Sequence, residues 1–508
     1  MTTVHSAHSI QVHNPADGTV VGAVPDQDRD AVAAAAAALR AAQPTWEEIG
    51  PAGRRKWLLS WQDWLIDNSA RLSEIVRSET GKPRATADIE VPAAVDLMKY
   101  WANNAARFLA DDHPKPHNLL GRTKQLTTCY RPYPVVGVIT PWNFPLLNVF
   151  FDALPALMAG AAVLVKPSEV TPLSAVEIGR GWTEIGAPPV FSVVTGSGNT
   201  GHAVVEAVDY LQFTGSTRTG RKIAAACGDR LIPCSLELGG KDPAIVLADA
   251  DLDRAANGIA YGSMFNAGQV CISIERVYVE EPVYDEFVAK LTERVAALRQ
   301  GDDARPYSAD VGALATPAQR DIVQRHVDEA LAAGARTTVG GKSTGTGTFF
   351  EPTVLVDVDH SMSCVTEETF GPTVPVMKVA DEDEAVRLAN DSIYGLSATV
   401  WTGDKQRGEK VARRLEAGAV NVNDSFANMF SFALPMGGWK QSGIGARWGG
   451  AAGIRKYCRQ QAITVPRLPM QKSEVTWFPA SKIKTRALIT LLQGMAARGK
   501  RRLPGPRS

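Results

Sequence analysis

The chain has 508 residues, of which 45% are hydrophobic and 21% charged, and its 54 basic and 54 acidic side chains give no net charge. This composition is typical of a globular protein with two or three domains, and a neutral chain has no general electrostatic affinity for nucleic acid. The six cysteines lack the paired spacing of a zinc site or a disulfide framework, so we expect reduced cysteines and no metal centre.

The N-terminal residues lack the apolar core of a signal peptide, and no run of about 18 apolar residues predicts a membrane span, so we expect a cytoplasmic protein. Residues 10–26 predict short extended pieces around the turn 14-NPADG-18. Helices are expected where apolar residues recur three and four apart, over 28–42, 52–68, 69–81 and 84–110. Residues 112–134 alternate polar and apolar side chains, which predicts a hairpin.

From residue 135 the pattern changes to alternating strands and helices. Strands are expected at 135–139, 161–165, 191–195 and 210–214, with helices near 146–159, 172–185, 199–207 and 217–226. This alternation predicts a parallel sheet covered by helices on both faces, an architecture that binds nucleotides at the C-terminal ends of its strands. A second α/β unit is expected from Lys241, followed by an ordered glycine-rich loop at 434–450 and a late edge strand at 460–467.

Cys271 is the strongest candidate for chemistry. It lies in 263-SMFNAGQVCISIERVYV-279, after a small polar turn and before a β-rich segment. A lone cysteine is ordinarily an inert buried hydrophobe. Upstream, however, the run 234-CSLELGGKDPAIVL-247 places Glu237 at the end of a strand, just before a Gly-Gly break where the backbone can turn sharply. A carboxylate and a thiol in such settings are a candidate base and nucleophile.

These two segments resemble the aldehyde dehydrogenase superfamily, whose general base lies in an ELGGK motif and whose nucleophile lies in a GQxC motif at about this spacing. The resemblance runs from roughly residue 10 to 466 and includes 434-LPMGGWKQSGIGARWGG-450, which is similar to the family stretch PFGGxKxSGxGxExG. It implies an α/β fold and assembly as a homodimer or homotetramer. The implied parts are a variant Rossmann NAD-binding domain (1–113 and 133–240), an α/β catalytic domain (241–442) and a β-hairpin oligomerisation arm (114–132 and 455–468).

The cofactor expectation also depends on the resemblance, because the usual G-x-G-x-x-G fingerprint is absent. The turn 215-GSTRTG-220 is similar to the family motif FTGS, and 366-TEETFGP-372 is similar to EExFGP. In 166-KPSE-169 a carboxylate at a strand end would accept hydrogen bonds from a ribose 2′-hydroxyl and repel a 2′-phosphate, which favours NAD over NADP; a solvated Lys-Glu pair is the alternative. The implied cofactor-binding residues are Trp142, Lys166, Ser168, Glu169, Gly215, Ser216, Leu238, Glu368 and Phe370.

The resemblance implies a mechanism with three groups. The thiolate of Cys271 attacks the aldehyde carbon, the amide of Asn143 and a backbone N–H hold the thiohemiacetal oxyanion, and hydride transfer leaves a thioester. Glu237 then activates water for hydrolysis. A carboxylate at the base position argues against the branch that passes the acyl group to coenzyme A. Because a free thiol has a pKa near about 8.5, we expect some activation of Cys271.

The predicted substrate pocket is apolar. Succinic semialdehyde dehydrogenases of the family often carry an Arg eight residues past the amide, and here that position is Phe151. With Phe144 and Ile272 this predicts an apolar or aromatic aldehyde. Succinate semialdehyde is the alternative substrate, because some actinobacterial relatives with that assignment share CISIER and FFEPTVL type stretches. A non-enzymatic protein that retains the fold is a further alternative, but the nucleophile, base and amide are all present.

The C-terminal tail differs from the usual family end. Residues 471–508 contain about nine Lys or Arg and one acidic residue, Glu474. The stretch 479–503 predicts a basic amphipathic helix. Two placements are open: peripheral contact with an anionic membrane surface, or docking on the body of the protein or a neighbouring subunit with 499–508 disordered.

Overall fold

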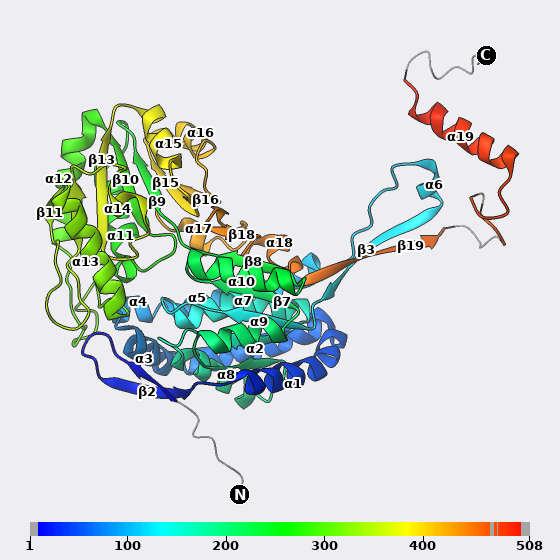
Figure 1. The fold of residues 1–508 in the computed structure, drawn as a ribbon, viewed down its shortest axis with the longest axis horizontal. Coiled ribbons are helices and arrows are strands. Elements are labelled where there is room, and N and C mark those ends of the chain that lie inside the picture. The colour runs from blue at the N-terminus through cyan, green and yellow to red at the C-terminus, as the bar shows by residue number, and fades with distance from the viewer. Residues whose placement is uncertain (1–8, 468–471, 475, 499–508) are drawn as a thin grey trace, which may run out of the picture. The chain divides into compact units, whose positions relative to one another are not determined.

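The computed structural model describes residues 9–467, 472–474 and 476–498. Backbone contacts divide the chain into two units (Figure 1). The first, called the body, comprises Met1–Ala110 and Tyr130–Gln460, and the second, called the arm unit, comprises Asp111–Cys129 and Gln461–Ser508. Within the described residues, no helix is long and apolar enough to cross a membrane.

The body begins with an antiparallel pair of strands and a layer of helices. β1 (Ser9–His13) pairs with β2 (Val20–Pro25) around the predicted turn. The helices that follow are α1 (Arg29–Glu48), α2 (Gly50–Asp67), α3 (Ser69–Thr80), α4 (Arg84–Ala87) and α5 (Glu90–Phe108). The prediction of one helix over 84–110 is therefore wrong. The helix is interrupted between α4 and α5, and the buried carboxylate of Glu90 at the start of α5 pairs with Lys82 Nζ at 2.8 Å.

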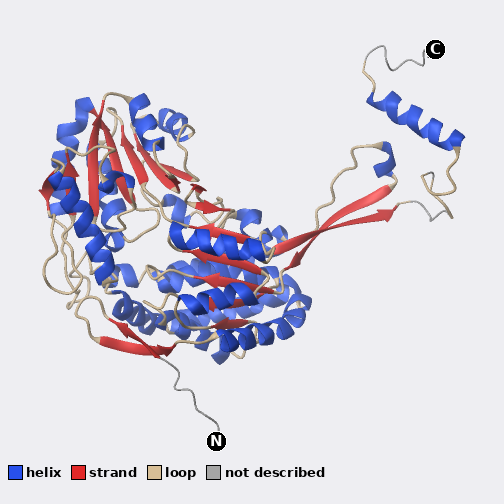
Figure 2. Cartoon of the chain, in the orientation of Figure 1, coloured by secondary structure: helices blue, strands red, loops and turns tan. Residues whose placement is uncertain are grey.

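A six-stranded sheet follows in the order β18-β8-β7-β4-β5-β6. Its strands are β4 (Val135–Ile139), β5 (Ala162–Lys166), β6 (Phe191–Val193), β7 (Tyr210–Thr214), β8 (Cys234–Glu237) and the antiparallel β18 (Gly443–Ile444). Its helices are α7 (Pro145–Ala159), α8 (Leu173–Glu184), α9 (Gly198–Ala207) and α10 (Thr217–Asp229), which cover both faces (Figure 2). The predicted strand and helix alternation is confirmed. Parallel pairing places the C-terminal ends of β5, β7 and β8 at one edge of the sheet.

The second half of the body holds a seven-stranded sheet in the order β11-β12-β13-β10-β9-β15-β16. The strands are β9 (Asp242–Val246), β10 (Ile274–Glu280), β11 (Arg336–Val339), β12 (Thr353–Val356), β13 (Thr373–Val379), β15 (Ser397–Trp401) and β16 (Ala419–Val422). Each sheet has its own apolar core. The helices are α11 (Leu252–Met264), α12 (Tyr284–Ala296), α13 (Pro317–Ala332), α14 (Ser363–Thr366), α15 (Glu382–Asn390), α16 (Lys405–Ala412) and α17 (Ala427–Phe430). The later helix α18 (Gly450–Arg455) packs against α5 and α7 in the first half.

The glycine-rich stretch 434–450 is ordered, but it is more than a loop. It contributes β17 (Trp439–Lys440), which pairs with β14 (Tyr394–Gly395), and β18, which adds to the six-stranded sheet beside β8. The register places Gly443 opposite Glu237, the predicted base. A segment from the far end of the chain therefore closes the edge of the sheet next to the predicted catalytic strand.

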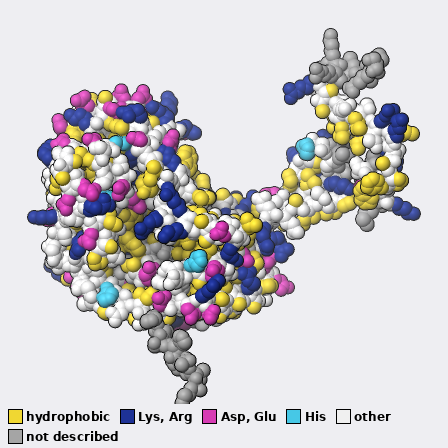
Figure 3. Space-filling view, in the orientation of Figure 1, with side chains coloured by type: hydrophobic (Ala, Val, Ile, Leu, Met, Phe, Trp, Pro, Cys, Tyr) yellow, Lys and Arg dark blue, Asp and Glu magenta, His cyan; other side chains and the backbone are white. Residues whose placement is uncertain are grey.

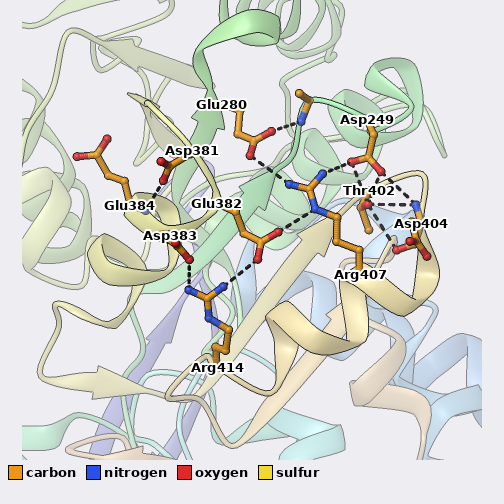
Figure 4. Close-up of polar contacts among 11 residues, drawn as sticks. Asp249, Glu280, Asp381, Glu382, Asp383, Glu384, Thr402, Asp404, Arg407 and Arg414 are labelled. Atoms are coloured by element: carbon orange, nitrogen blue, oxygen red, sulfur yellow. Dashed lines mark hydrogen bonds and ion pairs between the residues drawn. The ribbon is translucent and has the colours of Figure 1, made fainter.

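A network of ion pairs joins the ends of several elements in the second half (Figure 4). Arg407 on α16 pairs with Asp249, Glu280 and Glu382, with nitrogen to oxygen distances of 3.1, 3.3 and 2.8 Å. Arg414 pairs with Glu382 at 2.8 Å. Networks contribute more than isolated surface pairs because one ordered side chain serves several partners. This network holds α16 against the ends of β9 and β10, away from the cavity described below.

The arm unit contains a two-stranded sheet and a separate helix. β3 (Lys124–Pro132) pairs with β19 (Cys458–Pro466), so the two strands expected for the arm pair with each other. The hairpin predicted over 112–134 is wrong: within this described range β3 is the one strand, its partner β19 comes from the far end of the chain, and the range itself contributes an isolated bridge of Asp112 with Thr128 and the short helix α6 (Leu119–Arg122). The oligomerising role of the arm stays a prediction.

The predicted tail helix forms as α19 (Lys482–Ala496), with Ser481 as its N-cap. Ile483 is 82% exposed and Met495 49% exposed, and Figure 3 shows hydrophobic and basic side chains together on this segment. Contact with a membrane, the body or a neighbouring subunit stays a prediction, and the predicted disorder of 499–508 lies outside the described residues.

Candidate active site

A cavity of about 270 Å³ is lined by residues from both halves of the body. It brings together Cys271, Glu237 and Asn143, the three predicted catalytic residues, and the predicted pocket residues Phe144, Phe151 and Ile272. The cofactor candidates Trp142, Gly215, Ser216, Leu238, Glu368 and Phe370 also line it. Lys166, Ser168 and Glu169 do not line it; they lie where β5 ends and the following loop begins.

The loop that carries the nucleophile has an unusual backbone. Asn266 and Ala267 adopt φ values of 54° and 55°, a left-handed conformation that is strained for residues with a Cβ. Asn266 Nδ2 donates to the carbonyl of Gln269 at 3.2 Å and to the carbonyl of Asn143 at 3.1 Å. A Cβ on Gly268 would lie 2.0 Å from the carbonyl oxygen of Gly371, so only glycine fits there. These contacts hold the loop in one conformation before Cys271.

Glu237 ends β8 and is only 1% exposed. Neither carboxylate oxygen has a hydrogen-bond partner among the described residues. Burial raises the pKa of Glu237 to about 7, an effect that the charge of Arg447 opposes and that of Asp152 reinforces. An unpaired carboxylate that titrates near neutral pH is suited to accept a proton from water.

The thiol of Cys271 is not activated by the protein side chains. Burial, followed by the negative charge of Glu237, raises its pKa, whereas Arg447 lowers it. The expected activation is therefore wrong for the protein alone, because a thiolate here would lie in an apolar wall beside a carboxylate. A Cβ on Gly240 would lie 2.6 Å from the Cys271 carbonyl oxygen, which shows how closely the Gly-Gly break approaches the nucleophile.

Asn143 lies after β4 and is fixed on several sides. Lys82 Nζ donates to the backbone carbonyl oxygen of Asn143 at 2.7 Å. The side-chain Nδ2 of Asn143 donates to the backbone carbonyl oxygen of Gln269 at 2.9 Å. An amide nitrogen carries a second N–H. That second N–H can donate to an oxyanion formed on a substrate at Cys271, because both side chains line the same cavity.

The remaining polar groups fit a dinucleotide. The side chain of Glu368 can accept hydrogen bonds from ribose hydroxyl groups. It accepts a hydrogen bond from the N–H of Gly240 at 3.1 Å, and burial raises its pKa to about 8. Gly215 and Ser216 precede α10, and the N-terminus of a helix favours phosphate. Lys166 Nζ lies 3.4 Å from Glu169 Oε2 at the end of β5. No group of acidic, histidine or cysteine side chains able to hold a metal ion is found within the described ranges.

Three buried polar residues in the cavity region were not predicted: Asn148, Asp152 and Arg447. Asn148 and Asp152 are one turn apart on α7, which is otherwise apolar. Arg447 lies where the quoted family stretch has a Glu, as 445-GARWG-449 against GxExG. That departure and the polar positions in an apolar helix were the signals available in the sequence.

Comparisons with known proteins agree with this geometry. The sequence profile of the aldehyde dehydrogenase family matches residues 2–463. A Mycolicibacterium smegmatis protein provisionally named as an NADP(+) succinate-semialdehyde dehydrogenase is 42% identical, covering 93% of each chain. A crystal structure of succinate-semialdehyde dehydrogenase from Burkholderia pseudomallei is 37% identical with a TM-score of 0.87, covering 90% of this chain and 95% of that one. A Mycobacterium tuberculosis aldehyde dehydrogenase complexed with NAD+ is 33% identical with a TM-score of 0.86, covering 92% and 96%.

Proposed function

Because the chain belongs to the aldehyde dehydrogenase family and is thus an NAD(P)-dependent oxidoreductase acting on aldehydes, we propose that it oxidises an aldehyde to a carboxylic acid through covalent intermediates on Cys271. The observation that carries this proposal is that Cys271, Glu237 and Asn143 line one cavity. An unpaired buried carboxylate beside a thiol has no structural use and costs stability, whereas it serves hydrolysis of a thioester.

The side chains have separate tasks in this mechanism. The Cys271 thiol gives its proton to cavity water rather than to Glu237, and its sulfur adds to the aldehyde carbon. Asn143 Nδ2 and the backbone N–H of Cys271 hold the resulting oxyanion. The dinucleotide, when bound, supplies the hydride acceptor. Glu237 then accepts a proton from water, whose oxygen attacks the thioester carbon; the carbon–sulfur bond breaks and the acid leaves.

We propose NAD as the preferred cofactor. Glu169 follows the strand end at which the adenosine ribose is expected, and its exposed carboxylate would repel a 2′-phosphate. The M. smegmatis relative is named for NADP(+), so the comparison of initial rates with NAD and NADP is a direct test. A higher kcat/KM with NADP would refute this assignment and leave the catalytic proposal intact.

We propose an apolar or aromatic aldehyde as the substrate. Phe144, Phe151 and Ile272 are buried in the cavity wall, and Phe151 stacks on Trp448 with ring centroids 4.3 Å apart. Succinate semialdehyde is the second candidate. Two observations favour it: the names of the M. smegmatis and B. pseudomallei relatives, and Arg447, which alone among the described lining residues is cationic.

The experiment is NADH absorbance with purified protein, supplied with hexanal, benzaldehyde or succinic semialdehyde and with Cys271→Ala as the control. Hexanal or benzaldehyde turnover with the highest kcat/KM supports the apolar pocket. Preference for succinic semialdehyde would refute that pocket assignment. Turnover that required coenzyme A, or no NADH with any aldehyde under conditions where NAD binds, would refute hydrolytic oxidation.

A further inference from the structure

A continuous chain of buried hydrogen bonds joins Arg447 to the predicted oxyanion donor. Arg447 Nη2 donates to Asn148 Oδ1 at 2.7 Å, and Asn148 Nδ2 donates to Asn143 Oδ1 at 3.1 Å. The three residues are 3 to 5% exposed, so these bonds are shielded from bulk solvent. Asn148 and Arg447 are 299 positions apart in the chain, and they meet because the glycine-rich stretch folds back over α7.

The guanidinium of Arg447 sets the donor-to-acceptor direction of the hydrogen bonds that run from Arg447 through Asn148 to Asn143. An arginine side chain carries only donors, so the atom of Asn148 facing it must be the carbonyl oxygen. The amide nitrogen of Asn148 therefore faces Asn143 and requires an oxygen there. Asn143 is left with its nitrogen on the opposite side, where it meets Gln269 and the cavity. A reversed Asn143 amide would place an oxygen where an oxyanion needs a donor.

Arg447 itself is held in place by charge and by rings. Asp152 Oδ2 lies 3.4 Å from Arg447 Nη2, and both side chains are buried. The guanidinium carbon lies 5.1 Å from the ring centroid of Phe151 and 5.2 Å from that of Trp448. Ring faces attract a desolvated cation and favour a fixed orientation. Burying such an ion pair costs free energy of desolvation, which suggests a purpose other than stability.

We propose that Arg447 is a positioning residue for the oxyanion hole, acting through Asn148 to orient and polarise the amide of Asn143. This inference rests on the proposed function. Bonds in a buried chain polarise one another, so a cation at its start strengthens the N–H donor at its end. The Arg447 and Asp152 pair takes no part in bond making. The charge of Arg447 lowers the pKa of Cys271 and Glu237 directly, and Asn148 transmits its effect on Asn143.

The inference is tested with Asn148→Leu, which breaks the chain but leaves the Arg447 and Asp152 pair in place, and with Arg447→Met. We expect each to slow single-turnover NADH formation by about 10- to 100-fold, since misplacing a catalytic group by about 1 Å costs up to about 100-fold. The KM for NAD should stay unchanged in both variants. Alkylation of Cys271 should stay unchanged in Asn148→Leu and should slow in Arg447→Met, because the charge of Arg447 also lowers the pKa of the thiol. Arg447→Lys keeps a cationic donor and should restore most of the rate lost in Arg447→Met.

The matched control is Arg54→Met, which removes another buried arginine that donates to backbone carbonyls and does not line the cavity. It should lower thermal stability without slowing NADH formation by folded protein. An equal loss of rate in Arg54→Met and Arg447→Met would overturn the proposal, because general loosening would then explain both.

A double-mutant cycle with Asn143→Ala distinguishes the remaining roles. If Asn148 acts through Asn143, adding Asn148→Leu to Asn143→Ala should change the rate by less than about twofold, because coupled sites are not additive. Multiplied losses would overturn the proposal. So would an effect confined to the KM for succinic semialdehyde, or slow turnover after a normal first NADH, which would assign Arg447 to the substrate or to Glu237. Absence of NADH from the wild-type enzyme with every aldehyde would instead refute the proposed function.

Discussion

Glu237→Gln tests the base at the centre of the proposed mechanism. Glutamine keeps the size of the side chain but cannot accept a proton from water. Removal of a general base typically costs about 10²- to 10⁴-fold in the step it serves. We therefore expect turnover to fall by that factor, while a first NADH still forms rapidly at each site because attack and hydride transfer precede hydrolysis.

The pH dependence of the wild-type enzyme follows from the same residue. Burial raises the pKa of Glu237 to about 7. The fraction of ionised base is then about one half at pH 7 and about one tenth at pH 6, so kcat should fall about fivefold between them. In Glu237→Gln this dependence should vanish. A flat wild-type kcat between pH 6 and 8, or loss of the first NADH in the variant, would refute the assignment.

The stability of the folded protein should fall as pH rises, whereas kcat rises with pH. The pKa of Glu237 is raised from 4.5 to about 7 in the folded protein, so the native state binds this proton more tightly than the unfolded state does. Its contribution to stability therefore falls as pH rises from 4.5 through 7, by up to about 3 kcal/mol. Glu237→Gln should unfold at a higher temperature than wild type at pH 8 and at nearly the same temperature at pH 4.5. An equal difference at both pH values would contradict the shifted pKa.

Three further substitutions give separate readouts. Cys271→Ala should abolish NADH formation while calorimetry shows unchanged NAD binding. Turnover by this variant at the wild-type rate would refute covalent catalysis. Glu169→Gln should lower the KM for NADP relative to that for NAD, since it removes the repelling charge; an unmoved ratio would place the ribose elsewhere. Lys82→Met leaves the Glu90 carboxylate buried without its partner at 2.8 Å, so unfolding measurements should show a loss of about 3 to 5 kcal/mol, and an unchanged melting temperature would contradict the pairing.

Local patterns in the sequence determined much of the fold. The alternation of short apolar runs with amphipathic stretches between residues 135 and 226 predicts the parallel strands and their helices, because side-chain periodicity is a property of neighbouring residues. Cys271 and Glu237 were found for a similar reason: each stands in a short motif whose residue types are tied to its role. The helix expected over 84–110 is interrupted just before Glu90, whose buried carboxylate accepts from the backbone N–H groups of Leu146 and Leu147, 56 and 57 residues away.

Tertiary structure alone decided how the cavity behaves. Whether the Cys271 thiol is activated depends on burial and on the charge of Glu237, and both exist only after β8 and the nucleophile loop come together. The bond between Arg447 and Asn148 joins positions 299 residues apart, so no local pattern could reveal it. Sequence specifies which side chains carry donors and charges. Their proton affinities and partners are set by desolvation and distance, which arise when remote segments pack against each other.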